Sequence, residues 1–186
     1  MQSYLPSVRK QFEFYQVLGT NTFDQLSESD IHWKPDPEAN SIAIIVGHIY
    51  GNQLSRWTDF LTTDGEKEWR DRDREFEPTI QNMEELREKW KEGWNILYQA
   101  IDGLTVDQLA SIIYIRNEGH TVIEAINRQL SHYAYHVGQI VYLGRIQKGQ
   151  AWESLSVPKG TSKAYNQAKF TQTKARKHFT DEWIKA

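Results

Sequence analysis

Four long stretches of the chain place apolar residues at steps of three and four, and no stretch alternates apolar with polar residues over the length of a strand. This spacing gives a helix one apolar face, which is buried by packing against other helices. The length of 186 residues suffices for one domain with a sizeable core. The sequence therefore predicts an all-α four-helix bundle. We expect its helices over Ser7–Leu26, from Asn40 or Ser41 to Leu61, over Thr79–Ile101 and over Val122–Gln147.

The segments between these helices carry the signals of loops and turns. Residues 27–41 contain two prolines and several small polar residues, so we expect a loop there. Residues 62–78 are dense in charge and predict a long solvated loop, partly held against the helices by Trp69 and Phe76. Residues 112–121 predict a small extended pair that turns around Asn117 to Gly119.

The end of the chain differs in composition from the helical part. Beyond Gly149 polar residues are mixed with Pro158 and Gly160, and helical spacing is lost. We expect one helical domain over residues 1–150 and a C-terminal extension over residues 151–186. The extension is predicted to be irregular, packed on the bundle or trailing from it, and to end in a short helix near Arg176–Ile184.

The charge and the amino-acid composition exclude several classes of protein. The net charge of -3 leaves no basic surface for nucleic acid or for an acidic membrane. No apolar run is long enough to span a membrane, and the first residues lack the pattern of a signal peptide, so we expect a cytoplasmic protein. The chain has no cysteine, which excludes disulfides and thiolate ligands. Any thiol chemistry must use an external thiol.

The fourth helix contains two histidines in an otherwise apolar and aromatic stretch. Thr121 and Glu124 form a capping box that starts this helix, so that His132 and His136 lie in its middle. Residues four apart share one helix face, and two such imidazoles can bind one ion. The same pattern also fits two core histidines that are hydrogen-bonded to carbonyl groups or waters.

A third histidine favours the ion. His48 lies midway along the second helix, whose first half is apolar on nearly every side. One divalent ion would explain three histidines in the two most buried helices. Three neutral imidazoles with an open position are typical of a catalytic zinc-like site. We interpret the remaining histidines as surface residues outside the site; they are His32, His120 and His178.

Several residues near these histidines are candidates for a supporting role. Asn52 and Arg56 follow His48 by four and eight residues, on its face of the helix. Arg56 either reaches toward a ligand near the metal or forms a salt bridge with Asp59 or a glutamate. Gln129 and Gln139 are candidate hydrogen-bond partners that orient the ligating rings.

Two motifs carry a family resemblance over about residues 5–166. SIAIIVGHIYGN on the second helix and SHYAYHVGQI on the fourth resemble the DinB/YfiT-like metal-binding bundle proteins, and more closely a branch found in bacilli and relatives. The resemblance implies that His48, His132 and His136 bind one divalent ion, with zinc or nickel expected. Many relatives have arginine directly after the last ligand, whereas this chain has Val137.

Two functions of different classes follow from this interpretation. In the first, which the resemblance favours, the protein is a metal-dependent transferase that uses a low-molecular-weight thiol such as bacillithiol, mycothiol or glutathione. A metal-dependent hydrolase is the related alternative. In the second, the protein is a non-catalytic metal-binding stress or scaffold protein. We expect a homodimer that acts on a small molecule, since the family commonly pairs its bundles.

Overall fold

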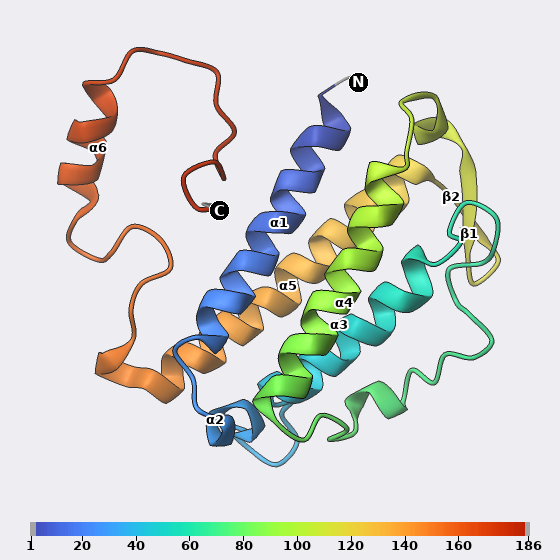
Figure 1. Cartoon of the computed structure of the whole chain (residues 1–186), viewed down its shortest axis with the longest axis horizontal. Helices are drawn as coiled ribbons and strands as arrows, with labels where there is room; N and C mark the ends of the chain where they lie inside the picture. Colours follow the sequence, from blue (N-terminus) through green and yellow to red (C-terminus); the bar gives the residue numbers. More distant parts are fainter. Residues whose placement is uncertain (1–2, 185–186) are drawn as a thin grey trace.

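Four long helices lie side by side in the computed structural model, which describes residues 3–184 (Figure 1). Helix α3 packs against α4 and α5, and α1 packs against α5 and α4. The expected all-α character is confirmed in broad terms, because one two-stranded sheet is the sole sheet in the described part of the chain. The long helices are α1 (Tyr4–Phe23), α3 (Ile42–Trp57), α4 (Met83–Asp102) and α5 (Val122–Lys148).

Local hydrogen bonds define where the helices begin. The Ser41 hydroxyl accepts from the Ile44 N–H at 3.3 Å and caps α3. At the start of α5, the Glu124 N–H donates to the Thr121 hydroxyl, and the Thr121 N–H donates to the Glu124 carboxylate. This capping box confirms the predicted start of the fourth helix, since it satisfies N–H groups that have no partner within the helix.

The predicted loop over residues 27–41 was wrong in part, because it contains the short helix α2 (Glu28–His32). The Ser27 N–H donates to the Asp30 carboxylate at 2.8 Å, which fastens the first turn. Ile31 is fully buried in the core. Five residues make a helix too short to be stable alone, so this one depends on its cap and on the burial of Ile31.

Aromatic side chains fill the centre of the molecule. The Phe12 ring contacts three other rings, with centroid distances of 6.4 Å to Trp57, 6.3 Å to Trp94 and 5.9 Å to Tyr133. Trp90 and Trp94 are both buried, as expected for core residues. Tyr133 is fully buried and accepts a hydrogen bond from Trp57 Nε1 at 3.0 Å. Burial of such large rings is a major source of stability.

The long connection between α3 and α4 returns along α3. It contains one turn of 3-10 helix, η1 (Arg74–Phe76), which packs on α3. Phe76 stacks on the His48 ring with centroids 4.6 Å apart, so the expected contact of this residue is present. Trp69 is 59% exposed, and its predicted role in holding the loop was wrong.

A β-hairpin also contacts the connection between α3 and α4. Strands β1 (Ile112–Ile115) and β2 (Glu118–Thr121) pair antiparallel, as predicted, although the turn lies at Arg116 and Asn117. Both turn residues have positive φ, 58° and 61°, and their N–H groups donate to the Asp64 carboxylate at 2.8 Å each. Asp64 therefore ties the hairpin turn to the loop after α3.

The C-terminal tail places its helix earlier than predicted. Helix α6 (Ser162–Phe170) has no buried residue. Residues 179–183 form turns and the rest of the segment 176–184 is irregular, so the helix expected over Arg176–Ile184 was wrong. The end of the tail contacts α1, where Ser7 Oγ lies 3.0 Å from His178 Nε2. Among residues 3–184, no helix combines the length and the apolar character that crossing a membrane requires.

Candidate metal centre

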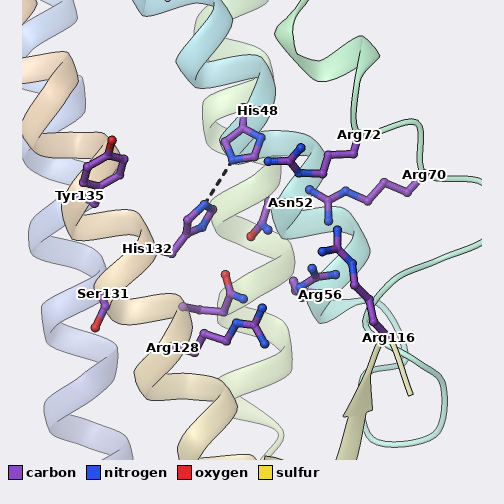
Figure 2. A pocket seen from close by; sticks show the side chains of 11 residues that line it. His48, Asn52, Arg56, Arg70, Arg72, Arg116, Arg128, Ser131, His132 and Tyr135 are labelled. Atoms are coloured by element: carbon purple, nitrogen blue, oxygen red, sulfur yellow. Dashed lines mark hydrogen bonds between the residues drawn. The ribbon is translucent and has the colours of Figure 1, made fainter. Parts of the chain in front are cut away.

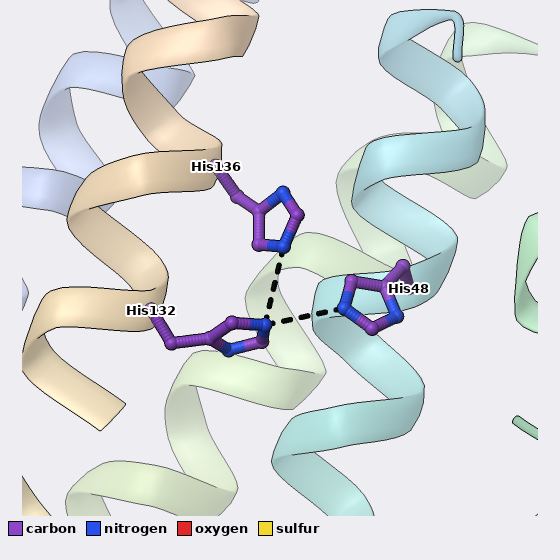
Figure 3. Close-up of side chains that lie close together, drawn as sticks. All are labelled: His48, His132 and His136. Atoms are coloured by element: carbon purple, nitrogen blue, oxygen red, sulfur yellow. Dashed lines mark hydrogen bonds between the residues drawn. The ribbon is translucent and has the colours of Figure 1, made fainter. Parts of the chain in front are cut away.

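Three histidine rings meet between α3 and α5 (Figure 3). His48 comes from α3, whereas His132 and His136 come from successive turns of α5. The Nε2 atom of His132 lies 3.2 Å from Nε2 of His48 and 3.1 Å from Nε2 of His136. One ligand atom from each of the three residues lies within 4.8 Å of the others, so that the cluster could hold a metal ion.

The spacing of the nitrogen atoms fits a shared ion. Imidazole nitrogens bind zinc at about 2.0–2.1 Å, so two ligands of one ion lie about 2.9–3.4 Å apart for angles between a right angle and the tetrahedral one. The observed separations of 3.2 Å and 3.1 Å fall within this range. The three ring pairs also meet edge to face, at interplanar angles of 86°, 90° and 68°.

The positions of the ring protons also fit a cation shared by the three histidines. His48 Nδ1 lies 2.8 Å from Glu75 Oε2, and His136 Nδ1 lies 2.8 Å from Gln139 Oε1. Both oxygens are acceptors, so each Nδ1 carries the proton and each Nε2 of the neutral ring presents a lone pair. His132 has one Nε2 proton at most and can satisfy only one of these two neighbours. A cation between the rings satisfies every lone pair.

The carboxylate of Glu75 is held in its charged form. Burial raises its pKa, but hydrogen bonds from His48 and Arg70 and the charge of Arg70 outweigh burial, so that the pKa of Glu75 lies below its usual value. Arg70 donates to both carboxylate oxygens, at 2.7 Å and 2.9 Å. An ionised acceptor behind a histidine ligand fixes the ring tautomer and orientation that a metal requires.

The histidines of α5 are held neutral. Burial is the main cause that lowers the pKa of His132, to about 3, and the neighbouring charges of His136, His48, Arg56 and Arg70 add to it. Burial also lowers the pKa of His136, and the hydrogen bond that the ring donates to Gln139 opposes this by raising it. Neutral imidazole is the form that binds metals, so the site is ready for a cation near neutral pH.

One glycine on α3, Gly51, gives the η1 segment access to His48. Gly47 and Gly51 flank His48 on the side that faces the loop. A methyl group at Gly51 would lie 2.7 Å from Glu75 Cδ, closer than real side-chain contacts allow. At Gly47 the nearest atom, the Glu75 carbonyl oxygen, would lie 3.6 Å away, which is an ordinary contact. The missing side chain at Gly51 therefore lets the Glu75 carboxylate reach His48.

The four candidate supporting residues lie near the histidines but have different partners. Gln139 contacts His136, as described above. Asn52 is buried and accepts from the Tyr133 hydroxyl at 3.0 Å. Arg56 donates to the Gly65 carbonyl group and pairs with Glu66 at 3.0 Å, so its salt-bridge partner is Glu66 and not Asp59. Gln129 is buried, and its Oε1 atom has no hydrogen-bond partner in the described part of the chain.

The remaining histidines lie outside the cluster. His32 is exposed and contacts the Gln81 carbonyl oxygen at 3.1 Å. His120 is half-buried at the end of β2 and lies 3.4 Å from Arg128. The surface prediction was incomplete for His120 and for His178, which is also half-buried and is bonded to Ser7 and Thr180. Val137, which follows the last histidine of the cluster, is a core residue.

A cavity of about 460 Å³ opens beside His48 and His132 (Figure 2). Its wall includes Asn52, Gln129, Ser131 and Tyr135. Five arginines complete the lining, and no acidic residue lines the cavity in the part of the chain described. Of these five arginines, only Arg56 was a candidate from the sequence.

The fold and the cluster define a mostly helical protein with a three-histidine site that could hold a metal ion. The family model described as "Protein of unknown function (DUF1572)" matches residues 1–161. Because the match covers most of the chain, the protein belongs to the DUF1572 family. A search of curated proteins found no match.

Proposed function

We propose that His48, His132 and His136 bind one divalent cation, zinc or nickel, and that the protein is a DinB/YfiT-like metal-dependent transferase that uses an external low-molecular-weight thiol. The observation that carries this proposal is the convergence of three Nε2 atoms beside a cavity. The resemblance of the histidine motifs and four long helices support the assignment to this group.

The donor set suits thiol activation. A divalent cation held by three neutral imidazoles keeps its full charge and lowers the pKa of a thiol beside it. In the transfer, the thiol loses its proton to solvent and its sulfur forms a bond to an electrophilic carbon, while the leaving group departs with its bonding electrons. The chain has no cysteine, so no internal thiolate competes for the cation.

The cavity favours thiol transfer over hydrolysis. A metal-dependent hydrolase commonly needs a general base within reach of the attacking water. The nearest carboxylates, Glu66 and Glu75, are engaged with arginines, and no acidic residue lines the cavity in the described chain. A thiol that ionises beside a cation needs no such base.

Elemental analysis after mild purification tests the metal site. We expect about one equivalent of zinc, nickel or a similar ion in the wild type and its loss in His132→Ala and His136→Ala. His120→Ala is the matched control, because His120 lies outside the cluster, and it should retain the ion. Equal metal in the wild type and in both cluster variants would refute the ligand assignment.

A separate experiment tests the transferase. Metal-loaded protein should bind one of bacillithiol, mycothiol or glutathione in calorimetry and accelerate its conjugation to an electrophile. His48→Ala should lose both the metal and turnover. If the loaded protein binds a metal but neither binds nor conjugates any of the three thiols, the transferase proposal fails and a non-catalytic metal-binding function takes its place.

A further inference from the structure

The five arginines of the cavity come from four separate parts of the chain, and their guanidinium groups converge on one space (Figure 2). Arg56 lies on α3 and Arg128 on α5, one turn before His132. Arg70 and Arg72 belong to the long connection before η1, and Arg116 lies in the hairpin turn. Repulsion between these like charges costs folding free energy, and an anion bound among them would offset this cost.

The fixed carboxylates balance part of this charge. Glu66 Oε2 lies 3.0 Å from Arg56, 3.1 Å from Arg70 and 3.3 Å from Arg116. Glu75 pairs with Arg70. Two carboxylates thus form ion pairs with three of the five arginines, so the arginines of the cavity outnumber these carboxylates by three.

The arginines divide into two groups by their partners. Arg70 makes three hydrogen bonds to Glu66 and Glu75, so its role is to hold the loop against α3. Arg72 and Arg128 have no carboxylate within ion-pair distance among residues 3–184. Arg72 lies 5.2 Å from the Phe76 ring centroid, and Arg128 lies 3.4 Å from His120 Nε2. A structural role for the loop does not explain these two.

The Arg56 side chain has one donor atom without a hydrogen-bond partner among the described residues. Its residue is 7% exposed, and its two terminal nitrogens are held by Gly65 and Glu66, so the guanidinium group has a fixed position. Its Nε atom is buried and has no hydrogen-bond partner among the described residues. An unpartnered donor of a charged group is costly to bury. Arg56 therefore places a fixed positive charge at the wall of the cavity.

We infer that this cavity binds the dianionic group of a small molecule, a phosphate monoester or a dicarboxylate, through Arg72 and Arg128 with Arg56 at its wall. The planar fork of arginine matches the paired oxygens of both groups. Excess charge of this size favours a dianion over a single carboxylate. Because the cavity adjoins His48 and His132, the dianion is part of the thiol or the electrophile, and this last step rests on the proposed function.

Calorimetry on the full chain tests the inference with three probes at matched ionic strength: inorganic phosphate, succinate and acetate. Metal-free protein, with the chelator removed, should bind phosphate or succinate at least tenfold more tightly than acetate. The tighter of the two dianions identifies the chemistry of the group. Equal affinity for acetate, or no binding of either dianion, would overturn the inference.

Variants locate the binding site. Arg72→Gln and Arg128→Gln should each weaken dianion binding by about tenfold, the usual effect of losing a hydrogen bond to a charged group. Arg145→Gln is the matched control, because Arg145 is an exposed cation on α5 outside this cavity, and it should bind as the wild type does. If the cavity variants bind as tightly as this control, the dianion does not bind here.

The experiments distinguish failure of the metal site from failure of the anion site. Dianion binding that depends on Arg128, in a protein that takes up no metal at the histidines, would refute the metal-dependent function and support the anion site. One equivalent of metal lost in His132→Ala, without any dianion binding, would refute the anion site and leave the metal centre. The use of metal-free protein prevents a bound ion from attracting the probe.

Discussion

Glu75 Oε2 lies 2.8 Å from His48 Nδ1, and both side chains are almost completely buried. The ionised carboxylate turns the His48 ring so that its Nε2 faces the two histidines of α5. Arg70 holds the same carboxylate from the other side. The long connection after α3 is therefore part of the candidate metal centre, although it supplies none of the three histidines.

The substitution Glu75→Gln should lower metal affinity by about 10–100-fold, the usual effect of removing the partner behind a histidine ligand. The amide can donate to His48 Nδ1, which would move the ring proton to Nε2 and block the lone pair that binds metal. Competition with a chelating dye measures the affinity. Glu77→Gln, an exposed position of the same segment, should leave it unchanged. Equal affinity in both variants would show that Glu75 does not orient His48.

The substitution Gly51→Ala should also weaken metal binding while the fold is kept. The added methyl group would force Glu75 away from His48, since it would lie 2.7 Å from Glu75 Cδ. Alanine itself favours the helix by about 1 kcal/mol relative to glycine. Gly47→Ala has room for the methyl group and serves as the control, which should gain stability and keep its metal affinity. Metal titration and thermal unfolding of both variants separate the two effects.

Local signals in the sequence were sufficient for the long helices. Apolar spacing located all four, and the capping box of Thr121 and Glu124 gave the start of α5 to the residue. The short helices were not predictable in this way. Helix α2 depends on the burial of Ile31, and α6 has no buried residue, so neither has an apolar face long enough to reveal its helical period.

The site was partly visible in the sequence for a similar reason. The histidines lie on helices, where spacing predicts direction, whereas Glu75 is one acidic residue in a segment full of charge. Gly51, three residues after His48, was a usable signal of close approach by another segment. Arg128 lies four residues before His132 and was predictable from the same helix face. Arg116 was not, because the hairpin turn is placed at the cavity by tertiary contacts with the loop after α3, such as its hydrogen bonds to Asp64.

The substitution Tyr133→Phe should destabilise the protein by about 1–3 kcal/mol, the cost of leaving buried polar groups without partners. The Tyr133 hydroxyl accepts from Trp57 Nε1 and donates to Asn52 Oδ1, each at 3.0 Å. Phenylalanine fills the same space but serves neither group. Urea unfolding measures the loss. Tyr142→Phe, on the exposed face of α5, should have no effect, and equal stability of the two variants would contradict the role of the hydroxyl group.

The stability of the metal-free protein should fall as the pH is lowered below about 6.5, the ordinary pKa of histidine. Burial and the neighbouring charges lower the pKa of His132 to about 3 in the folded state. Between these two values the unfolded chain binds one more proton than the folded chain, so the free energy of unfolding decreases as the pH falls. The stabilising contribution of the neutral histidine is complete above the upper value. One such histidine contributes a slope of about 1.4 kcal/mol per pH unit.

Urea unfolding at several pH values between 7.5 and 4.5 measures this slope. The pKa values of Glu75 and Asp64 are lowered in the folded state, so protonation of these carboxylates also destabilises the protein in acid. The informative quantity is therefore the difference in slope between variants. His132→Ala removes the titrating group and should give a shallower slope than the wild type. His120→Ala, outside the cluster, should keep the wild-type slope. Parallel slopes in all three proteins would contradict a neutral His132 in the folded state, and with it the readiness of the site to bind a cation.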